Sequence, residues 1–178
     1  DAGAVYIYSG VDGSLIRAHS GLEAGDFFGG TIAGLGDLDR DYVMDYAIGA
    51  DHADSEGLEN SGAVSFFSGV DGRPLEKFTG PHEHAYFGRA ISGLGNFIAN
   101  QQKGILIGTE WSDWGGLEDC GSVDLYCYDP YLYGVGDVLY QGYQAVRLDV
   151  SDGGLLEFEL DFPSEAAGYE YRLIISRA

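Results

Sequence analysis

The sequence repeats itself at a fixed interval of 59 residues without a gap, and this repeat constrains the fold more than any other feature. Residues 3–61 match residues 62–120, with about 21 of the 59 aligned pairs identical. The clearest matches are Ser9–Gly13 with Ser68–Gly72, and Phe28-Gly29 with Phe87-Gly88. A third copy starts at Gly121 and then loses the pattern. Periods of this size are typical of solenoids, propellers and other arrays.

Short β-type runs and glycine-rich turns decide between these arrays. Gly-Val-Asp-Gly occurs at 10–13 and 69–72 and predicts a hairpin turn, because glycine readily adopts a positive φ. No segment shows a sustained apolar period of 3.6 residues, so we expect helices to be minor. The predicted strands are Ala4–Tyr8, Thr31–Ala33, Tyr46–Gly49, Ala63–Phe67, Ala90–Ser92, Ile105–Gly108 and Val123–Tyr128. Four strands in about 60 residues indicate the blade of a β-propeller.

Composition excludes several classes of partner. The chain has 29 acidic and 9 basic side chains and a formal net charge of −20. Such a surface repels phosphate, so neither nucleic acid nor an anionic membrane surface is an expected partner. No apolar run reaches the roughly 20 residues of a membrane span. Hydrophobic residues make up 45% of the chain, which is enough to build a core despite the charge.

Four segments together resemble the FG-GAP repeat, the blade unit of integrin-α-type β-propellers and of many secreted bacterial proteins. These segments are Phe28-Gly29, Gly36–Asp41, Asp45–Ala50 and Gly62–Phe67. The resemblance implies an all-β chain and a secreted or cell-surface location. In its register one blade covers 28–80 and the next covers 86–133, while 3–21 form the outer half of another. Residues 1–133 would then hold about two and a half blades.

Two and a half blades cannot close a ring, since no propeller closes with fewer than about four. We therefore expect a fragment of a longer protein, an assembly of several copies or a short open array, and we favour the fragment. An unpaired blade face would be an apolar patch and a site of self-association. From residue 134 to residue 178 the repeat is absent, and alternating residues at 145–150, 155–162 and 170–176 predict a small antiparallel β appendage.

A run of alternating carboxylates suggests a calcium loop. Asp37, Asp39, Asp41 and Asp45 occupy positions 1, 3, 5 and 9, and Val43 at position 7 would offer its carbonyl. Ca²⁺ takes six to eight oxygen ligands, and it would remove the repulsion between the clustered carboxylates. The pattern resembles the Ca²⁺ loop between the first two strands of FG-GAP blades. The alternative is a solvated acidic turn.

Two residues of this loop depart from the family pattern. Tyr42 takes the sixth position, where similar loops have glycine, and Arg40 adds a positive charge, so we expect weakened calcium binding. The second copy lacks most of the carboxylates and is expected to bind no calcium; its equivalent positions are Asn96, Ile98, Asn100 and Gly104. We therefore expect the ion to have a structural role.

Loops at the other end of the strands are candidates for ligand binding. By resemblance to integrin-like propellers, the loops between the second and third strands lie on the ligand face, and an inter-blade segment joins them there. The residues concerned are His52, Asp54, His82, His84, Trp111, Asp113 and Trp114. Exposed tryptophan in a polar loop can stack on a sugar or anchor a protein. For the tryptophans the alternative is that one of them packs under its own loop. For His82 and His84 the alternative is an ordinary exposed turn.

No nucleophile elbow, zinc-protease motif or phosphate-binding glycine loop occurs in the sequence, so we expect no enzyme activity. The sequence predicts a calcium-stabilised extracellular module for adhesion or binding, with a protein or a glycan as its ligand. Two alternatives stay open: an accessory propeller of a secreted hydrolase, and a ring formed by several copies of the chain.

Overall fold

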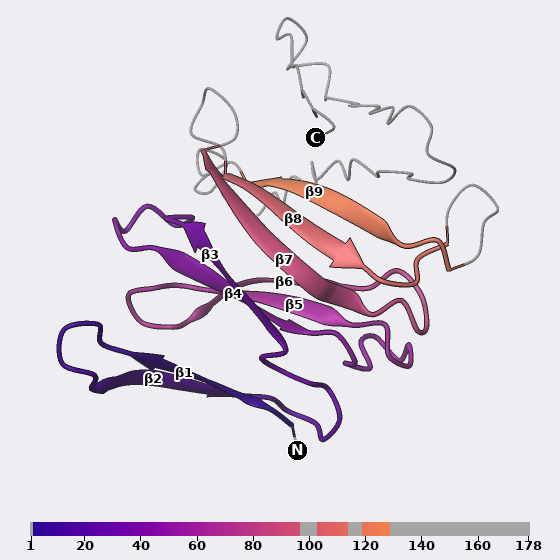
Figure 1. The fold of residues 1–178 in the computed structure, drawn as a ribbon, viewed down its shortest axis with the longest axis horizontal. Helices are drawn as coiled ribbons and strands as arrows, with labels where there is room; N and C mark the ends of the chain where they lie inside the picture. Colours follow the sequence, from indigo (N-terminus) through magenta and orange to yellow (C-terminus); the bar gives the residue numbers. More distant parts are fainter. Residues whose placement is uncertain (1, 97–102, 114–118, 129–178) are drawn as a thin grey trace, which may run out of the picture.

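The computed structural model describes residues 2–96, 103–113 and 119–128. Within these ranges every regular element is a β-strand, and the strands form three antiparallel sheets that follow one another across the molecule (Figure 1). The prediction of an all-β chain is confirmed for this part. None of the described residues builds a helix that is long and apolar enough to cross a membrane. The predicted β appendage at 134–178 lies outside the described ranges.

Each sheet pairs strands that are neighbours in the sequence. The first sheet is a hairpin of β1 (Ala4–Tyr8) and β2 (Leu15–Ser20). The second sheet has the order β3 (Thr31–Gly36), β4 (Asp45–Ala50), β5 (Ala63–Phe67) and β6 (Pro74–Thr79). The third sheet has the order β7 (Phe87–Asn96), β8 (Lys103–Thr109) and β9 (Ser122–Tyr128).

The strands at the two Phe-Gly pairs, β3 after the first pair and β7 starting with the second, are longer than the sequence predicted. β3 continues to Gly36 instead of ending at Ala33, and β7 runs over ten residues. The extensions could not be predicted from strand propensity, because they contain glycine, which is a poor strand former. The pairing shifts register between Gly34 and Gly36, where a residue without a side chain permits a bulge.

Backbone hydrogen bonds recur at the interval of the sequence repeat. Four bonds of the first copy each have an equivalent 59 residues later. The pairs are Gly13 N to Ser9 O with Gly72 N to Ser68 O; Gly21 N to Gly3 O with Gly80 N to Gly62 O; His52 N to Asp26 O with Trp111 N to Ala85 O; and Gly62 N to Ala53 O with Gly121 N to Ser112 O. The two members of each pair differ by 0.1 Å or less in donor–acceptor distance. Turns and loop crossings therefore have the same backbone arrangement in both copies.

The Phe-Gly pair has a steric role at the contact between sheets. Gly29 and Gly88 have φ of 90° and 89°, in the left-handed region that favours glycine. A Cβ on Gly88 would lie 2.5 Å from Cγ2 of Val64, and one on Gly29 would lie 2.7 Å from Cγ2 of Val5. Each hairpin thus packs against the next sheet through the same close approach.

The main core lies between the second and third sheets. Its fully buried members come from both sheets and the loop after β3: Leu35, Leu38, Ala47, Val64, Phe66, Phe87, Ile105 and Ile107. Each sheet therefore buries its apolar face against its neighbour, as expected of a repeat array. This packing fixes the strand ends, and the loops that they carry form the two candidate sites.

Candidate functional site

The acidic loop, residues 37–44, connects β3 to β4 and gathers three of the predicted carboxylates. One oxygen from each of Asp37, Asp39 and Asp45 lies within 4.8 Å of the other two. Asp45 is buried at the start of β4, and the side chain of Asp39 is only 6% exposed. The spacing read from the sequence thus corresponds to a real cluster of oxygen atoms.

Local hydrogen bonds curl this loop. The backbone N–H groups of Asp41 and Tyr42 donate to the two carboxylate oxygens of Asp37, at 3.1 and 3.0 Å. The N–H of Leu38 donates to Oδ2 of Asp45 at 2.5 Å. Tyr42 has a φ of 67°, as its place at the sixth position predicted, and it is exposed. The chain therefore adopts a turn that favours glycine, but with a tyrosine in it.

Asp41, another predicted ligand, makes different contacts, and the carbonyl of Val43 stays a predicted ligand. Oδ1 of Asp41 accepts a hydrogen bond from the N–H of Val43 at 2.8 Å, and Oδ2 accepts one from the hydroxyl of Ser68 at 3.3 Å. Asp41 is not a member of the group of three carboxylates. Its contacts instead tie the acidic loop to the β5–β6 turn.

The buried carboxylates of the acidic loop carry an electrostatic cost. Burial raises the pKa of Asp39, the charge of Asp41 raises it further, and Arg73 opposes both effects. Burial also raises the pKa of Asp45, against the hydrogen bonds that its carboxylate receives from Gly69 and Leu38. Moreover, Oδ1 of Asp39 is buried and has no hydrogen-bond partner among the described residues. An oxygen-preferring divalent cation fits this donor set, because it would supply the missing partner.

The β5–β6 turn brings a positive charge to this cluster that the sequence did not reveal. Nη2 of Arg73 lies 2.7 Å from Oδ2 of Asp39, and the N–H of Gly69 donates to Oδ1 of Asp45 at 2.9 Å. Sequence reasoning considered Arg40 as the nearby cation. A signal for Arg73 existed, since it directly follows the second Gly-Val-Asp-Gly turn, where the first copy has Ser14.

A second group of loops, here called the loop face, consists of residues 21–30, 51–62, 80–86, 110–113 and 119–121. Because β4 runs from Asp45 to Ala50, the acidic loop and residues 51–62 lie at opposite ends of this strand. The N–H of Asp113 lies 3.4 Å from Nε2 of His82, so two predicted ligand residues from separate loops meet. The N–H of His84 donates to the carbonyl of Glu59 at 2.7 Å. Trp114 lies outside the described residues.

A row of rings crosses the loop face. The ring centroids of Phe27 and His52 are 4.4 Å apart, those of His52 and Tyr86 are 4.8 Å apart, and those of Tyr86 and Trp111 are 5.4 Å apart. The two ends of the row are accessible, with Phe27 58% and Trp111 46% exposed. Sequence reasoning identified His52 and Trp111 but missed Phe27 and Tyr86. These two residues share one position of the repeat and could have been found from it.

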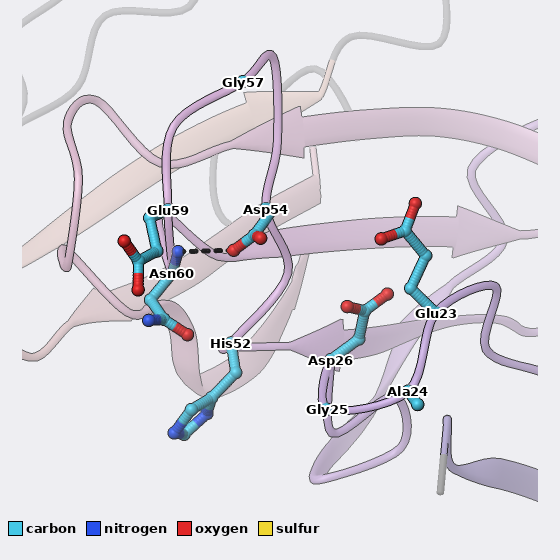
Figure 2. A pocket seen from close by; sticks show the side chains of 9 residues that line it. All are labelled: Glu23, Ala24, Gly25, Asp26, His52, Asp54, Gly57, Glu59 and Asn60. Carbon is cyan, nitrogen blue, oxygen red and sulfur yellow. Dashed lines mark hydrogen bonds between the residues drawn. The ribbon is translucent and has the colours of Figure 1, made fainter.

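A pocket opens beside this row, between residues 23–26 and 52–60 (Figure 2). Its lining residues are Glu23, Ala24, Gly25, Asp26, His52, Asp54, Gly57, Glu59 and Asn60. Figure 2 shows carboxylates from both loops around the hollow, with Asp54 held by the N–H of Asn60 at 2.8 Å. Four carboxylates and no lysine or arginine belong to this described lining. Asp54 and His52 were predicted ligand residues, and the other members were missed.

Among the residues described, non-glycine residues with a positive φ are confined to these two regions. Eight described non-glycine residues have a positive φ: Arg40 and Tyr42 in the acidic loop, and Phe27, Glu56, Asn60, His84, Tyr86 and Asp119 in the loop face. Residues held in this region of φ cost roughly 1–3 kcal/mol each, and they cluster at functional sites. The distribution of strain agrees with the assignment of both regions as candidate sites.

Comparison with known proteins finds sequence similarity over part of the chain. No family model matches the chain. The chain is 32% identical to integrin alpha-5 of Xenopus laevis over 119 residues. This match covers 61% of the chain and 11% of the relative, so the chain spans about a tenth of that protein's length. The similarity indicates an FG-GAP-like relationship, and the antiparallel sheets of the described residues are consistent with a fragment of a β-propeller.

Proposed function

We propose that this chain is part of a calcium-stabilised extracellular module for adhesion or binding. In this proposal the three sheets belong to FG-GAP-type blades, about two and a half in number, and residues 134–178 form a separate β appendage. The loop face contacts the ligand, which is a protein or a glycan. The similarity to integrin alpha-5 and the repeated packing of the sheets support this reading.

The row of rings on the loop face is the observation that carries the proposal. Four loops that are distant in sequence contribute one ring each to a continuous line with accessible ends. Rings of this kind supply large contact area at small entropic cost, and they also stack on the apolar faces of sugars. The adjoining pocket adds carboxylates that can accept hydrogen bonds from hydroxyl or amino groups.

Calcium supports the fold at the other end of the strands. Asp37, Asp39 and Asp45 would hold the ion, and the buried, unpartnered Oδ1 of Asp39 is the atom that most requires it. The ion would neutralise the clustered charge, and the carboxylate oxygens of these residues would serve as its ligands. Because these residues lie far along the strand from the loop face, we propose a structural role for calcium and no catalytic activity for the chain.

A binding screen tests this function. The whole chain, in millimolar Ca²⁺, is applied to a glycan array and to a panel of purified extracellular matrix proteins. For any ligand found, Phe27→Ala and Trp111→Ala are each expected to weaken binding about thirtyfold, since truncation of an anchoring ring costs about 2 kcal/mol. Val11→Ala serves as the control, because Val11 is exposed in the β1–β2 turn, away from the loop face. Equal losses for all three variants, or no ligand in either panel, would count against the proposal.

Self-association is a second proposal and rests on the open edge of β1. Within the repeat β1 and β2 correspond to β5 and β6, which are preceded by β4 and β3 in a four-stranded sheet. Within the residues that the structure describes, the first sheet has only the equivalents of the outer two strands. We propose that another segment or another copy completes this sheet, which includes the case of a ring built from several copies.

A further inference from the structure

We propose that Arg73 is the built-in counter-cation of the acidic loop, and that a divalent cation has to displace its guanidinium from Asp39 in order to bind. This inference rests on the proposed calcium site and adds the residue that controls it. It also explains how four neighbouring carboxylates are tolerated when no ion is bound.

The position of Arg73 supports direct competition with the ion. Its Nη2 lies 2.7 Å from Oδ2 of Asp39, whose side chain is 94% buried and whose other oxygen has no partner in the described part of the chain. Asp39 belongs to the three carboxylates that converge within 4.8 Å. A guanidinium that contacts one of these carboxylates occupies a coordination position and repels an incoming cation.

Arg73 also has an alternative carboxylate partner within its own turn. Its side chain is 52% exposed, and its Nε already lies 3.8 Å from Oδ2 of Asp71, a carboxylate that is 55% exposed. When the guanidinium leaves Asp39, it can pair with Asp71 at the surface of the same turn. The guanidinium therefore leaves the buried carboxylate of Asp39 for the exposed carboxylate of Asp71, and the ion binds Asp39 in its place.

The repeat supplies a substitution that the turn tolerates. Ser14 occupies the equivalent position in the β1–β2 turn, where its carbonyl accepts a hydrogen bond from Ser9 N at 2.8 Å. In the β5–β6 turn the carbonyl of Arg73 accepts the same bond from Ser68 N at 3.0 Å. Arg73→Ser therefore removes the charge and keeps the backbone arrangement, and Arg73→Gln is a second variant of longer reach.

A matched control is available in the third sheet. Arg89 is 55% exposed and pairs with Asp51 at 2.6 Å and with Glu110 at 3.3 Å, so it too bridges one buried and one exposed carboxylate. Arg89 belongs to β7, outside the acidic loop and the turn that contacts it. Arg89→Ser changes the net charge of the chain by the same amount and separates general electrostatics from local competition.

The experiment is a calcium titration of the whole chain by calorimetry, paired with thermal unfolding in EGTA and in saturating Ca²⁺. Arg73→Ser and Arg73→Gln are expected to lower the Kd for calcium at least about tenfold. Arg73→Lys is expected to keep an affinity close to that of the unaltered chain, and Arg89→Ser to change it less than about twofold. In EGTA the Arg73→Ser protein should unfold at a lower temperature than the unaltered chain, because Asp39 has lost its partner, and saturating calcium should remove this difference.

Different results would contradict the calcium site and the competition by Arg73. If the unaltered chain binds calcium and the two neutral Arg73 variants bind it equally or more weakly, Arg73 is no competitor, while the calcium site stands. If neither the unaltered chain nor any variant binds calcium, both the site and the role of Arg73 are wrong.

Discussion

Nε2 of His19 lies 2.6 Å from the hydroxyl oxygen of Tyr46, and this contact joins β2 of the first sheet to β4 of the second. The imidazole ring also packs at 4.3 Å between centroids against Phe67 of β5. Burial lowers the pKa of His19 below its usual value of 6.5, and the charge of Arg17 on the same strand lowers it further. The folded chain therefore favours neutral His19.

This relationship predicts a loss of stability in mild acid. Because the pKa of His19 is lower in the folded state, the unfolded chain takes up a proton first as the pH falls below about 6.5. Unfolding then becomes easier, and the stability lost on the acid side is regained above this pH. His19→Gln is expected to flatten the pH dependence of the melting temperature between pH 7.5 and pH 5.5, measured by circular dichroism. A variant with the full pH dependence of the unaltered chain would assign the effect to other groups.

Calcium should raise the stability of the chain through the acidic loop. A ligand that binds only the folded state adds about 2.7 kcal/mol at a hundredfold excess over its Kd. We therefore expect a higher melting temperature in millimolar Ca²⁺ than in EGTA, and no such shift after Asp39→Asn. Two controls should retain the shift: Asp12→Asn, which removes a charge from the β1–β2 turn, and Asn96→Ala in the second copy. A shift that survives Asp39→Asn would show that calcium binds elsewhere.

The close approach at the Phe-Gly pair should make Gly88 sensitive to substitution. Gly88→Ala forces a Cβ to within 2.5 Å of Cγ2 of Val64 at a φ of 89°. We expect a loss of about 2–4 kcal/mol in the free energy of unfolding, measured with urea, from strain and overpacking together. Gly57→Ala is the matched control, because Gly57 has a φ of 84° but no atom within 4 Å of the added Cβ. Its expected cost is about 1 kcal/mol, and equal costs at both sites would contradict the packing argument.

Self-association through the open edge of β1 should raise the mass that is measured for the chain in solution. Light scattering over a range of concentrations is expected to find association, and a closed ring would give a fixed small multiple of the monomer mass. Introducing charge with Tyr6→Lys and Tyr8→Lys should reduce this association, because lysine protects an edge strand. Val11→Lys, in the exposed β1–β2 turn, should leave it unchanged. A monomer at every concentration would leave self-association without support.

Much of the fold could be predicted from the sequence, because its determinants are local. The Gly-Val-Asp-Gly turns and the alternation of apolar residues specify hairpins within a few residues of chain, and both hairpins are present. The repeat interval carries these local signals from one copy to the next. Where the prediction was incomplete, as at the ends of β3 and β7, glycine had removed the side-chain signal.

The candidate sites divide in the same way. The cluster at Asp37 and Asp39 could be predicted from the sequence, since these residues are close neighbours in one loop. The approach of Arg73 to Asp39 and the row of Phe27, His52, Tyr86 and Trp111 became visible in the folded chain alone. Such contacts join residues tens of positions apart, and they depend on how each sheet packs on the next. The close approach of Val64 to Gly88 is part of that packing, and no local pattern in the sequence specifies the resulting distances.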